Sequence, residues 1–324
     1  MNRTERRIVF ISTKNLDYIR NVQEIKILKE KYDEVLIVGS TSSSYVKRLV
    51  AIFKKLFTTS LKKYDEIFIG FAPQLILPFW GWKFRNKKIT IDFFISVYDT
   101  MVQDRKKIKK DSLSACIIHW LDKFTLKKAD RVIGDTKAHI AYFAEEFKID
   151  KDKFEVLYLE ADKKVYYPRN IEKPDELKNK FVVLYFGSIL PLQGVEIVLE
   201  AVNYLKDRED IFFWIIGPLA GKEKMIENHN IRLDKWLAQK ELANAIGMAD
   251  LCLAGHFNPN IDKADRTIPG KAYIYEAMNK KIILGNTKAN RELFMEQAGK
   301  YYFVDRGNAA ALAEEIVRIK SQSI

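Results

Sequence analysis

The chain has 324 residues, of which 48% are hydrophobic and 30% charged, a balance typical of a folded globular protein with room for two domains. Its two cysteines, Cys116 and Cys252, are too few for a disulfide framework or a cysteine-based zinc cluster. No apolar run approaches the roughly 20 residues of a membrane-spanning helix, and the first apolar run is too short for a secretory signal, so we expect a cytoplasmic protein.

The net charge of +12 is concentrated in the first half of the chain. Residues 1–165 hold 33 Lys and Arg against 22 Asp and Glu, whereas residues 166–324 hold 22 against 21. A basic half favours an anionic partner, which could be nucleic acid, an anionic membrane surface or a phosphate-bearing substrate. A generally lysine-rich proteome is the alternative. Charge is the only feature that favours nucleic acid, because an RNA-binding sheet motif with aromatic side chains is absent, so we expect no nucleic-acid partner.

Short runs of Val, Ile and Phe alternate along the chain with longer segments of helical period. In the first half this pattern predicts strands at Ile8–Ser12, Glu34–Val38, Glu66–Gly70, Lys88–Phe94, Arg131–Gly134 and Phe154–Leu157. Helical patterns lie between them, at Val22–Lys31, Ser44–Lys63 and Ser112–Lys127. In the second half it predicts strands at Phe181–Phe186, Ile211–Gly217, Leu251–Ala254 and Lys281–Gly285, with helices at Val195–Leu205, Leu242–Gly247 and Lys271–Asn279.

Buried strands that alternate with helices imply parallel sheets covered on both faces, so the fold class is α/β. Two such series predict two doubly wound, Rossmann-like domains, at residues 1–165 and 166–324. The polar stretch Tyr166–Lys180, with two prolines, is predicted to link them. Ligands of open parallel sheets bind beyond the carboxyl ends of the strands, so we expect the active site in a cleft between two facing domains.

Two strand-to-helix loops of the second half could hold phosphate. In FVVLYFGSILPLQGVEIVLEAV, a buried strand opens at Gly187-Ser188 and a helix follows, so that backbone N–H groups and a helix N-terminus can face an anion. In RTIPGK, Arg266 and Lys271 flank the start of a helix and could stabilise charge on a diphosphate leaving group. An ordinary glycine turn and a solvated basic loop are the alternatives for these two loops.

These motifs resemble the retaining glycosyltransferases of family 4, which have the GT-B fold. FGSILPLQGVEIVLEAV, WIIGPL, ADLCLAG and RTIPGKAYIYEAMNKKIILGNT agree with the family in order, as do KADRVIGDTKAHIAYF and VLYLEADKKVYYPR before them. TIDFFISVYDTMVQDR resembles one subgroup, and the rest of the first 125 residues agrees mainly in pattern. The resemblance implies a nucleotide-diphosphate sugar donor, retention at the anomeric carbon and no required metal or cofactor. It also allows the final helix to pack back on the N-terminal domain.

The chain departs from the family at charged positions. Ser188 and Gln193 stand where the family has Arg and Lys, and Arg266 and Ile274 stand where it has a pair of glutamates. Glu276 can replace the second glutamate only if the register slips by two residues. The family's Gly and Pro after the donor helix are Asn279 and Lys281 here. The donor site is therefore either rebuilt around Arg266 and Lys271 or partly disabled.

Positions at strand ends, loop charges and the resemblance together suggest a set of site residues. Lys271 and Arg266 are expected to be catalytic on the donor side, with donor contacts from Gly187, Ser188, Gly217, His256, Glu276, Thr287, Arg291 and Glu292. Asp99, after the strand Lys88–Phe94, is the candidate catalytic acid near the transferred sugar. Asp135, Arg20 and Asn21 are candidates on the acceptor side. A helix cap or a satisfied loop acid is the alternative for Asp99 and Asp135, and the four histidines show no metal-ligand spacing.

A basic amphipathic segment favours a membrane interface. In Ser44–Lys63 one helical stripe carries Val46, Val50, Phe53 and Phe57, with Leu49 and Leu56 beside it and Lys47, Arg48, Lys54 and Lys55 flanking it. Trp80 and Trp82 follow beside Lys83, Arg85, Lys87 and Lys88. A helix that packs on the sheet with a basic outer face is the alternative.

The hypothesis is thus a cytoplasmic hexosyltransferase, able to sit peripherally on the inner face of the membrane. It would move a sugar to a cell-surface glycan or a lipid-linked acceptor. The alternative is a catalytically degenerate GT-B-fold binding subunit of a partner enzyme.

Overall fold

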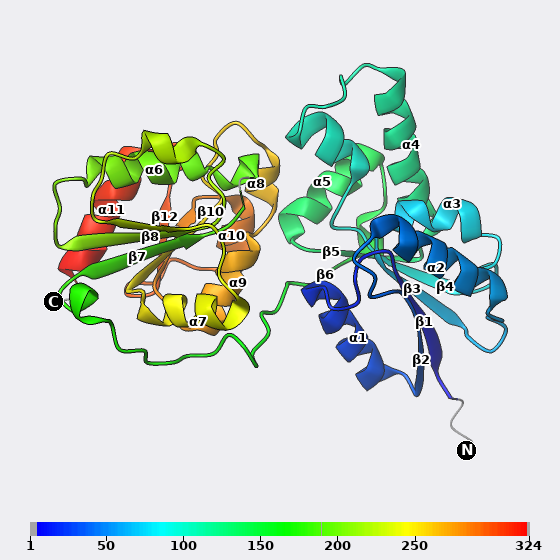
Figure 1. Ribbon diagram of the computed structural model, residues 1–324. Coiled ribbons are helices and arrows are strands. Elements are labelled where there is room, and N and C mark those ends of the chain that lie inside the picture. Colours follow the sequence, from blue (N-terminus) through cyan, green and yellow to red (C-terminus); the bar gives the residue numbers. More distant parts are fainter. Residues whose placement is uncertain (1–4, 189, 323–324) are drawn as a thin grey trace. The chain divides into compact units, whose positions relative to one another are not determined.

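The computed structural model describes residues 5–188 and 190–322 (Figure 1). The chain divides into two compact units, Met1–Glu160 and Ala161–Ile324. This division falls five residues before the boundary expected from the sequence. Each unit is built on its own six-stranded parallel sheet, so the predicted α/β class with two doubly wound domains is confirmed.

The N-terminal sheet contains the six predicted strands in the order β2-β1-β3-β4-β5-β6. Their bounds are β1 (Arg7–Ser12), β2 (Glu34–Val38), β3 (Glu66–Phe71), β4 (Lys88–Asp92), β5 (Arg131–Gly134) and β6 (Phe154–Val156). The strand order reverses between β1 and β3, and it is at such a point that an open parallel sheet forms a crevice.

Helices cover both faces of this sheet. α1 (Ile19–Lys31) packs through Leu28 on one face, against Ile8 and Phe10. The other face carries α2 (Tyr45–Thr58), α3 (Leu77–Trp80), α4 (Leu113–Lys128) and α5 (Lys137–Phe147). Side-chain caps set the starts of three of these helices, because the hydroxyls of Ser44, Ser112 and Thr136 accept from backbone N–H groups three residues on.

The C-terminal sheet has the order β12-β11-β10-β7-β8-β9, which is the strand order of dinucleotide-binding Rossmann folds. Its strands are β7 (Phe181–Phe186), β8 (Ile211–Ile216), β9 (Ile231–Asp234), β10 (Leu251–Gly255), β11 (Ile282–Gly285) and β12 (Tyr301–Val304). The sequence pattern missed the two edge strands, β9 and β12.

The C-terminal helices are α6 (Val195–Tyr204), α7 (Gln239–Met248), α8 (Lys263–Arg266), α9 (Gly270–Ala277), α10 (Lys288–Leu293) and α11 (Ala309–Ser321). Figure 1 shows α6 and α11 on one face of the sheet and α7 and α9 on the other. The final helix, α11, packs against α6 and buries Leu312, Ile316 and Ile319 in the core of its own unit. Within residues 5–188 and 190–322, no helix is long and apolar enough to cross a membrane.

Candidate functional site

The carboxyl edge of the C-terminal sheet brings most of the predicted donor residues together. Gly187 follows β7 and His256 follows β10, and these strands are neighbours at the point where the strand order reverses. Gly217 follows β8 and Thr287 lies two residues beyond β11. Ser188 is exposed in the loop that follows β7.

Lys271 is the most unusual side chain at this edge. It stands in the first turn of α9, is only 5% exposed, and its Nζ lies 3.7 Å from the centre of the Tyr185 ring. A Cβ atom on Gly187 would lie 2.7 Å from that Nζ, so the amine sits directly against the glycine loop. Nζ has no hydrogen-bond partner among the residues that the structure describes, and burial lowers the pKa of Lys271 well below the ordinary lysine value. The amine is therefore a buried donor that an anion at Gly187 could satisfy.

Glycines let the loops of this edge approach one another. A Cβ on Gly217 would lie 2.0 Å from the Gly187 carbonyl oxygen, and one on Gly285 would lie 2.1 Å from the His256 carbonyl oxygen. Asn290, fully buried in α10, donates to the carbonyl oxygens of Gly285 (2.8 Å) and Gly255 (3.4 Å). These contacts hold the ends of β10 and β11 at fixed positions.

His256 is a buried, neutral imidazole at the same edge. Burial lowers its pKa to about 3 and nearby Lys271 acts in the same direction, against hydrogen bonds to the backbone of Ala264 and Thr267. Its Nδ1 has no hydrogen-bond partner in the described part of the chain. A neutral imidazole can exchange hydrogen bonds with a sugar or phosphate oxygen without adding charge.

Three other predicted donor-side residues, two arginines and a glutamate, lie on α8 and α10. Arg266 ends α8 and is half-buried, in the segment that leads into α9. Arg291 is exposed on α10, where its Nε donates to Asn286 Oδ1 at 2.5 Å and its guanidinium lies 4.4 Å from the centre of the Phe303 ring. Glu292 follows on the same helix and is half-buried.

Glu276 does not join these groups. Its carboxylate accepts from Lys300 Nζ at 3.1 Å and from the Tyr301 hydroxyl, at the start of β12 and hence at the opposite edge of the sheet. The cause is the direction of α9, which runs back from the carboxyl edge and carries Glu276 away from Lys271. Asn279, just after α9, has a φ of 53°, a left-handed conformation that glycine adopts at least cost.

In the N-terminal unit, Arg20 and Asn21 serve the fold itself. The Arg20 guanidinium binds Asp92 through two contacts, of 2.5 and 2.9 Å, and donates to the Leu157 carbonyl oxygen at 2.7 Å. Asn21 donates to the Asn15 carbonyl oxygen at 2.6 Å and accepts from Ser12. Both side chains are at most 3% exposed, so they fix the start of α1 on the strand ends and do not face solvent.

Glu24 is a buried carboxyl group that no motif in the sequence singles out. It fills the space over Gly70, where a Cβ would lie 2.4 Å from Glu24 Oε2. Burial, reinforced by the nearby Asp92 carboxylate, raises the pKa of Glu24 well above its ordinary value and outweighs Arg20. A neutral Glu24 beside the Arg20–Asp92 pair avoids a buried unpaired charge.

His139 joins two of the predicted acids. Its Nδ1 lies 2.8 Å from Asp135 Oδ1, and its Nε2 lies 3.9 Å from Asp99 Oδ2. Asp99 and His139 are fully buried, whereas the Asp135 side chain is 21% exposed. Burial acts to raise the pKa of Asp135, but His139 and then Arg20 outweigh it and the net shift is downward. Of the two acids, Asp135 is thus the one that reaches the surface. The four-residue spacing of Asp135 and His139 at the start of a helix is the sequence signal that could have revealed the pair.

The exposure of the predicted amphipathic segment is partly as expected from the sequence. Val46, Val50 and Phe57 of α2 are 70, 63 and 75% exposed, and Trp82 is 70% exposed. Trp80, however, is buried, because it packs against Phe53 of α2 (ring centres 5.7 Å apart).

Arg48 does not flank the apolar stripe of α2 as expected. It is 7% exposed and donates to the backbone carbonyls of Thr13 and Ser42, which holds the start of α2 on the preceding loop.

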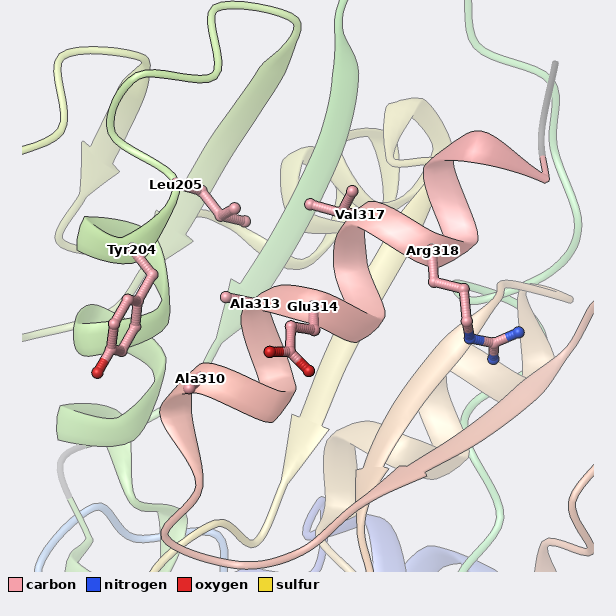
Figure 2. Close-up of a pocket in the computed structure, with 7 residues that line it drawn as sticks. All are labelled: Tyr204, Leu205, Ala310, Ala313, Glu314, Val317 and Arg318. Atoms are coloured by element: carbon pink, nitrogen blue, oxygen red, sulfur yellow. The ribbon is translucent and has the colours of Figure 1, made fainter.

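A hollow of about 490 Å³ lies on the outer face of the C-terminal unit, between α6 and α11 (Figure 2). None of the predicted donor residues lines it; the lining residues are Tyr204, Leu205, Ala310, Ala313, Glu314, Val317 and Arg318. Among the described residues there is no group of three or more His, Cys, Asp or Glu that could hold a metal ion.

Residues 180–322 match the family model described as glycosyl transferases group 1. The probable glycosyltransferase WbjE of Pseudomonas aeruginosa is 23% identical to this chain over 250 residues, which are 72% of this chain and 60% of WbjE. The match therefore spans less than two thirds of the length of that relative.

Solved structures show the same fold. Anabaena HepE in complex with UDP-glucose superposes with a TM-score of 0.67 at 14% identity, over 98% of this chain and 90% of HepE. Sucrose-phosphate synthase from Thermosynechococcus elongatus gives 0.67 at 13% identity, with the same coverage. A glycosyltransferase from Rickettsia africae gives 0.67 at 18% identity, over 98% of this chain and 88% of that protein. The chain therefore has the GT-B fold of these structures.

Proposed function

We propose that this chain is a glycosyltransferase that takes a sugar from a nucleoside-diphosphate sugar. Buried Lys271 is the observation that carries the proposal. Its amine lies against the Gly187 loop at the reversal point of a Rossmann-type sheet, beside the start of α9. A diphosphate at Gly187-Ser188 would give that amine the anionic partner it lacks. The match of residues 180–322 to a glycosyltransferase family model supports the same assignment.

Each of these groups has a chemical role in the proposal. Negative charge grows on the diphosphate as the glycosidic bond breaks, and a fixed ammonium at Lys271 stabilises that charge more in the transition state than in the ground state. Backbone N–H groups of the β7 loop and the first turn of α9 add partial positive charge. Arg266 supplies a second cation from the loop before α9, in place of the charges that Ser188 and Gln193 do not provide.

On the acceptor side we propose Asp135 as the group that contacts the incoming hydroxyl. His139 keeps this carboxylate ionised, and buried Asp99 lies on the other side of the imidazole, with its Oδ2 3.9 Å from Nε2. In this proposal Asp99 acts through His139. The acceptor is a glycan or a lipid-linked sugar.

The exposed stripe of α2 favours an acceptor held at an anionic membrane surface. Val46, Val50 and Phe57 lie on the side of α2 away from the sheet, with Lys47 and Lys54 near them. Apolar side chains beside lysines suit the boundary between lipid headgroups and acyl chains.

The test is donor turnover by the purified protein. A thermal-shift screen with nucleoside-diphosphate sugars identifies the donor, because a ligand that binds the folded state raises its apparent stability. Lys271→Ala should then lower turnover on the order of a hundredfold, the scale for one lost transition-state partner. Unchanged turnover in both Lys271→Ala and Arg266→Ala would overturn the donor-site assignment.

We further propose retention of the anomeric configuration without a metal, as the resemblance to family 4 implies. Activity should persist in chelator, and NMR of the product should give the anomeric configuration of the donor. Metal-restored activity or an inverted product would contradict these two statements respectively.

A second candidate is a catalytically degenerate subunit that binds a partner enzyme. Ser188, Gln193 and Ile274, at positions where the family has charged residues, favour it. Nucleotide-sugar binding without turnover, with any acceptor, would support this candidate.

A further inference from the structure

The outer face of α4 is apolar and uncovered in the described structure. Leu113, Ile117 and Trp120 are 77, 55 and 60% exposed, and Phe124 stacks on Trp120 with ring centres 5.3 Å apart. These residues recur every three or four positions, so they form one stripe along the helix. The buried residues Ala115, Asp122 and Leu126 lie about 180° around the helix axis, at 100° per residue. The stripe therefore points directly away from the sheet.

Basic residues border this stripe. From Arg105 to Lys128 the chain holds eight Lys and Arg against two Asp. A hollow of about 530 Å³ on this face is lined by two aromatic rings and three lysines: Trp120, Lys123, Phe124, Lys127 and Lys128. Pairing this face with that of a second copy would bring like charges together, which opposes association. An anionic lipid surface instead complements both the charge and the apolar stripe.

The α4 stripe belongs to the same helix layer as the α2 stripe. Ile52 of α2, Leu77 of α3 and Ala115 of α4 all enter one hydrophobic core on one face of the N-terminal sheet. Phe53 of α2 meets Phe79 beside it (ring centres 6.1 Å apart), and α3 contacts α4. Figure 1 shows α2, α3 and α4 as neighbours on this side.

This layer carries exposed apolar side chains on all three of its segments. Besides those of α2 and α4, Phe79 of α3 is 61% exposed and Trp82 just after α3 is 70% exposed. The outer side of the layer is thus one apolar and basic face.

We infer that α4 is a second membrane-contact helix, and that α2 and α4 together seat the N-terminal unit on an anionic bilayer. Two separated helices that contact the surface at once fix the orientation of the unit, which a single helix does not. This inference rests on the lipid-surface acceptor proposed above, but it makes a separate claim about α4.

Cys116 allows a direct measurement. It is exposed beside the α4 stripe, whereas Cys252 is buried, so a thiol-reactive, polarity-sensitive fluorophore labels α4 selectively. With phosphatidylglycerol in phosphatidylcholine vesicles the emission should shift to the blue and intensify. Pure phosphatidylcholine should give no shift, and added salt should reverse the effect.

Three matched variants separate the contributions. Combined Leu113→Ser, Ile117→Ser and Trp120→Ser should weaken vesicle binding about tenfold or more, since these side chains would insert at the interface. Combined Val46→Ser, Val50→Ser and Phe57→Ser tests α2 in the same way. Combined Tyr204→Ser, Trp236→Ser and Met295→Ser removes three large apolar groups that are also more than half exposed, but on the C-terminal unit, and should leave binding unchanged. Melting curves check that each variant is folded.

The outcomes distinguish the two claims. If the α2 variant loses binding and the α4 variant keeps it, the inference on α4 is wrong while the lipid-surface proposal stands. If the wild-type protein ignores anionic vesicles at low salt, both are wrong. A vesicle-independent emission change that grows with protein concentration, with a dimer in sedimentation, would assign the face to a second copy and overturn the inference.

Discussion

Lys271 illustrates a side chain that costs stability in the absence of a ligand. Its amine is buried over the Tyr185 ring, a contact that favours a cation but does not replace a hydrogen-bond acceptor. Burial lowers its pKa, so the folded state binds this proton more weakly than the unfolded chain does. Such a penalty is expected where a site is completed by an anionic substrate.

Replacing this amine should therefore lower the activity and raise the stability of the protein without ligand. Lys271→Met keeps the shape and removes the buried polar group, so the free energy of unfolding without ligand should rise by about 1 kcal/mol or more. The stability gap between variant and wild type should shrink steadily as the pH rises toward the ordinary lysine pKa, because the lysine then becomes neutral in both states. Chemical denaturation across this pH range measures it, and a gap that widens with pH would contradict the burial argument. Turnover of the variant should fall as for Lys271→Ala.

Asp135 gives a second prediction at this scale. Asp135→Asn removes the charge that His139 and Arg20 stabilise, and kcat with a given acceptor should fall on the order of a hundredfold. The thermal shift with the nucleotide sugar should not change, because the proposed donor residues lie in the other unit. Glu145→Gln, an exposed acid on the same helix, is the control and should keep full activity. Loss of donor binding in Asp135→Asn would assign the carboxylate a different role.

The same carboxylate predicts a pH dependence of stability. Because the folded state lowers the pKa of Asp135, its charge stabilises the fold above the ordinary aspartate pKa. That contribution is lost as the pH falls through the folded-state value. Wild type should thus be more stable than Asp135→Asn at neutral pH, and the difference should close on acidification. Equal stability at neutral pH would show that the contact of Asp135 with His139 contributes nothing net to stability.

At the scale of elements, the strand-end loops of the C-terminal sheet can approach one another closely because glycine has no Cβ atom. Gly217 has a φ of 139°, and a Cβ there would meet the Gly187 carbonyl oxygen at 2.0 Å. Gly217→Ala should displace the β7 loop, destabilise the fold by about 1–3 kcal/mol and weaken nucleotide-sugar binding. Gly221→Ala is the control: its φ of 90° is also positive, but no atom lies within 4 Å of the new Cβ. If both variants lose binding equally, backbone conformation rather than the close approach of the two loops is responsible.

The sequence predicts a central strand well where it is a continuous apolar run, as in Phe181–Phe186, which the structure recovers with the same bounds. It misses β9 because an edge strand alternates less clearly: Arg232 and Leu233 are both exposed there. Strand ends also place Gly187 and His256 at one edge of the sheet, since carboxyl ends of parallel strands share an edge.

The sequence does not show which polar side chains become buried. Arg20 and Arg48 look like surface cations, yet each is drawn inside by partners far along the chain, at Asp92 and at the Thr13 carbonyl. Glu276 lies two residues after Ile274, the position that aligns with the glutamate of the family. Helix α9 places it at the edge of the sheet opposite Lys271. His139 lacks metal-ligand spacing, so its link to Asp99, forty residues away, becomes visible only in the fold.

At the scale of the whole molecule, the charge difference between the halves follows the division into two units. The basic half forms the unit with the exposed helix layer, and the near-neutral half forms the unit with the proposed donor site. Each unit also has its own hydrophobic core: one core joins residues from Val9 to Ile149, the other residues from Phe181 to Ile319. The proposed lipid contact and the proposed donor site therefore lie in separate folded units.

This separation predicts that the C-terminal unit works alone as a nucleotide-sugar binder. A fragment of residues 161–324 contains Lys271, Gly187, His256 and the complete second core, so it should fold and show a thermal shift with the donor found for the full chain. It should not transfer sugar, because Asp135 and His139 are missing, and it should not bind anionic vesicles. Circular dichroism and calorimetry on the fragment provide the measurement, with its Lys271→Ala form as the control that loses the shift. A folded fragment without a donor shift would place part of the donor site in the N-terminal unit, and an unfolded one would show that the second core depends on the first.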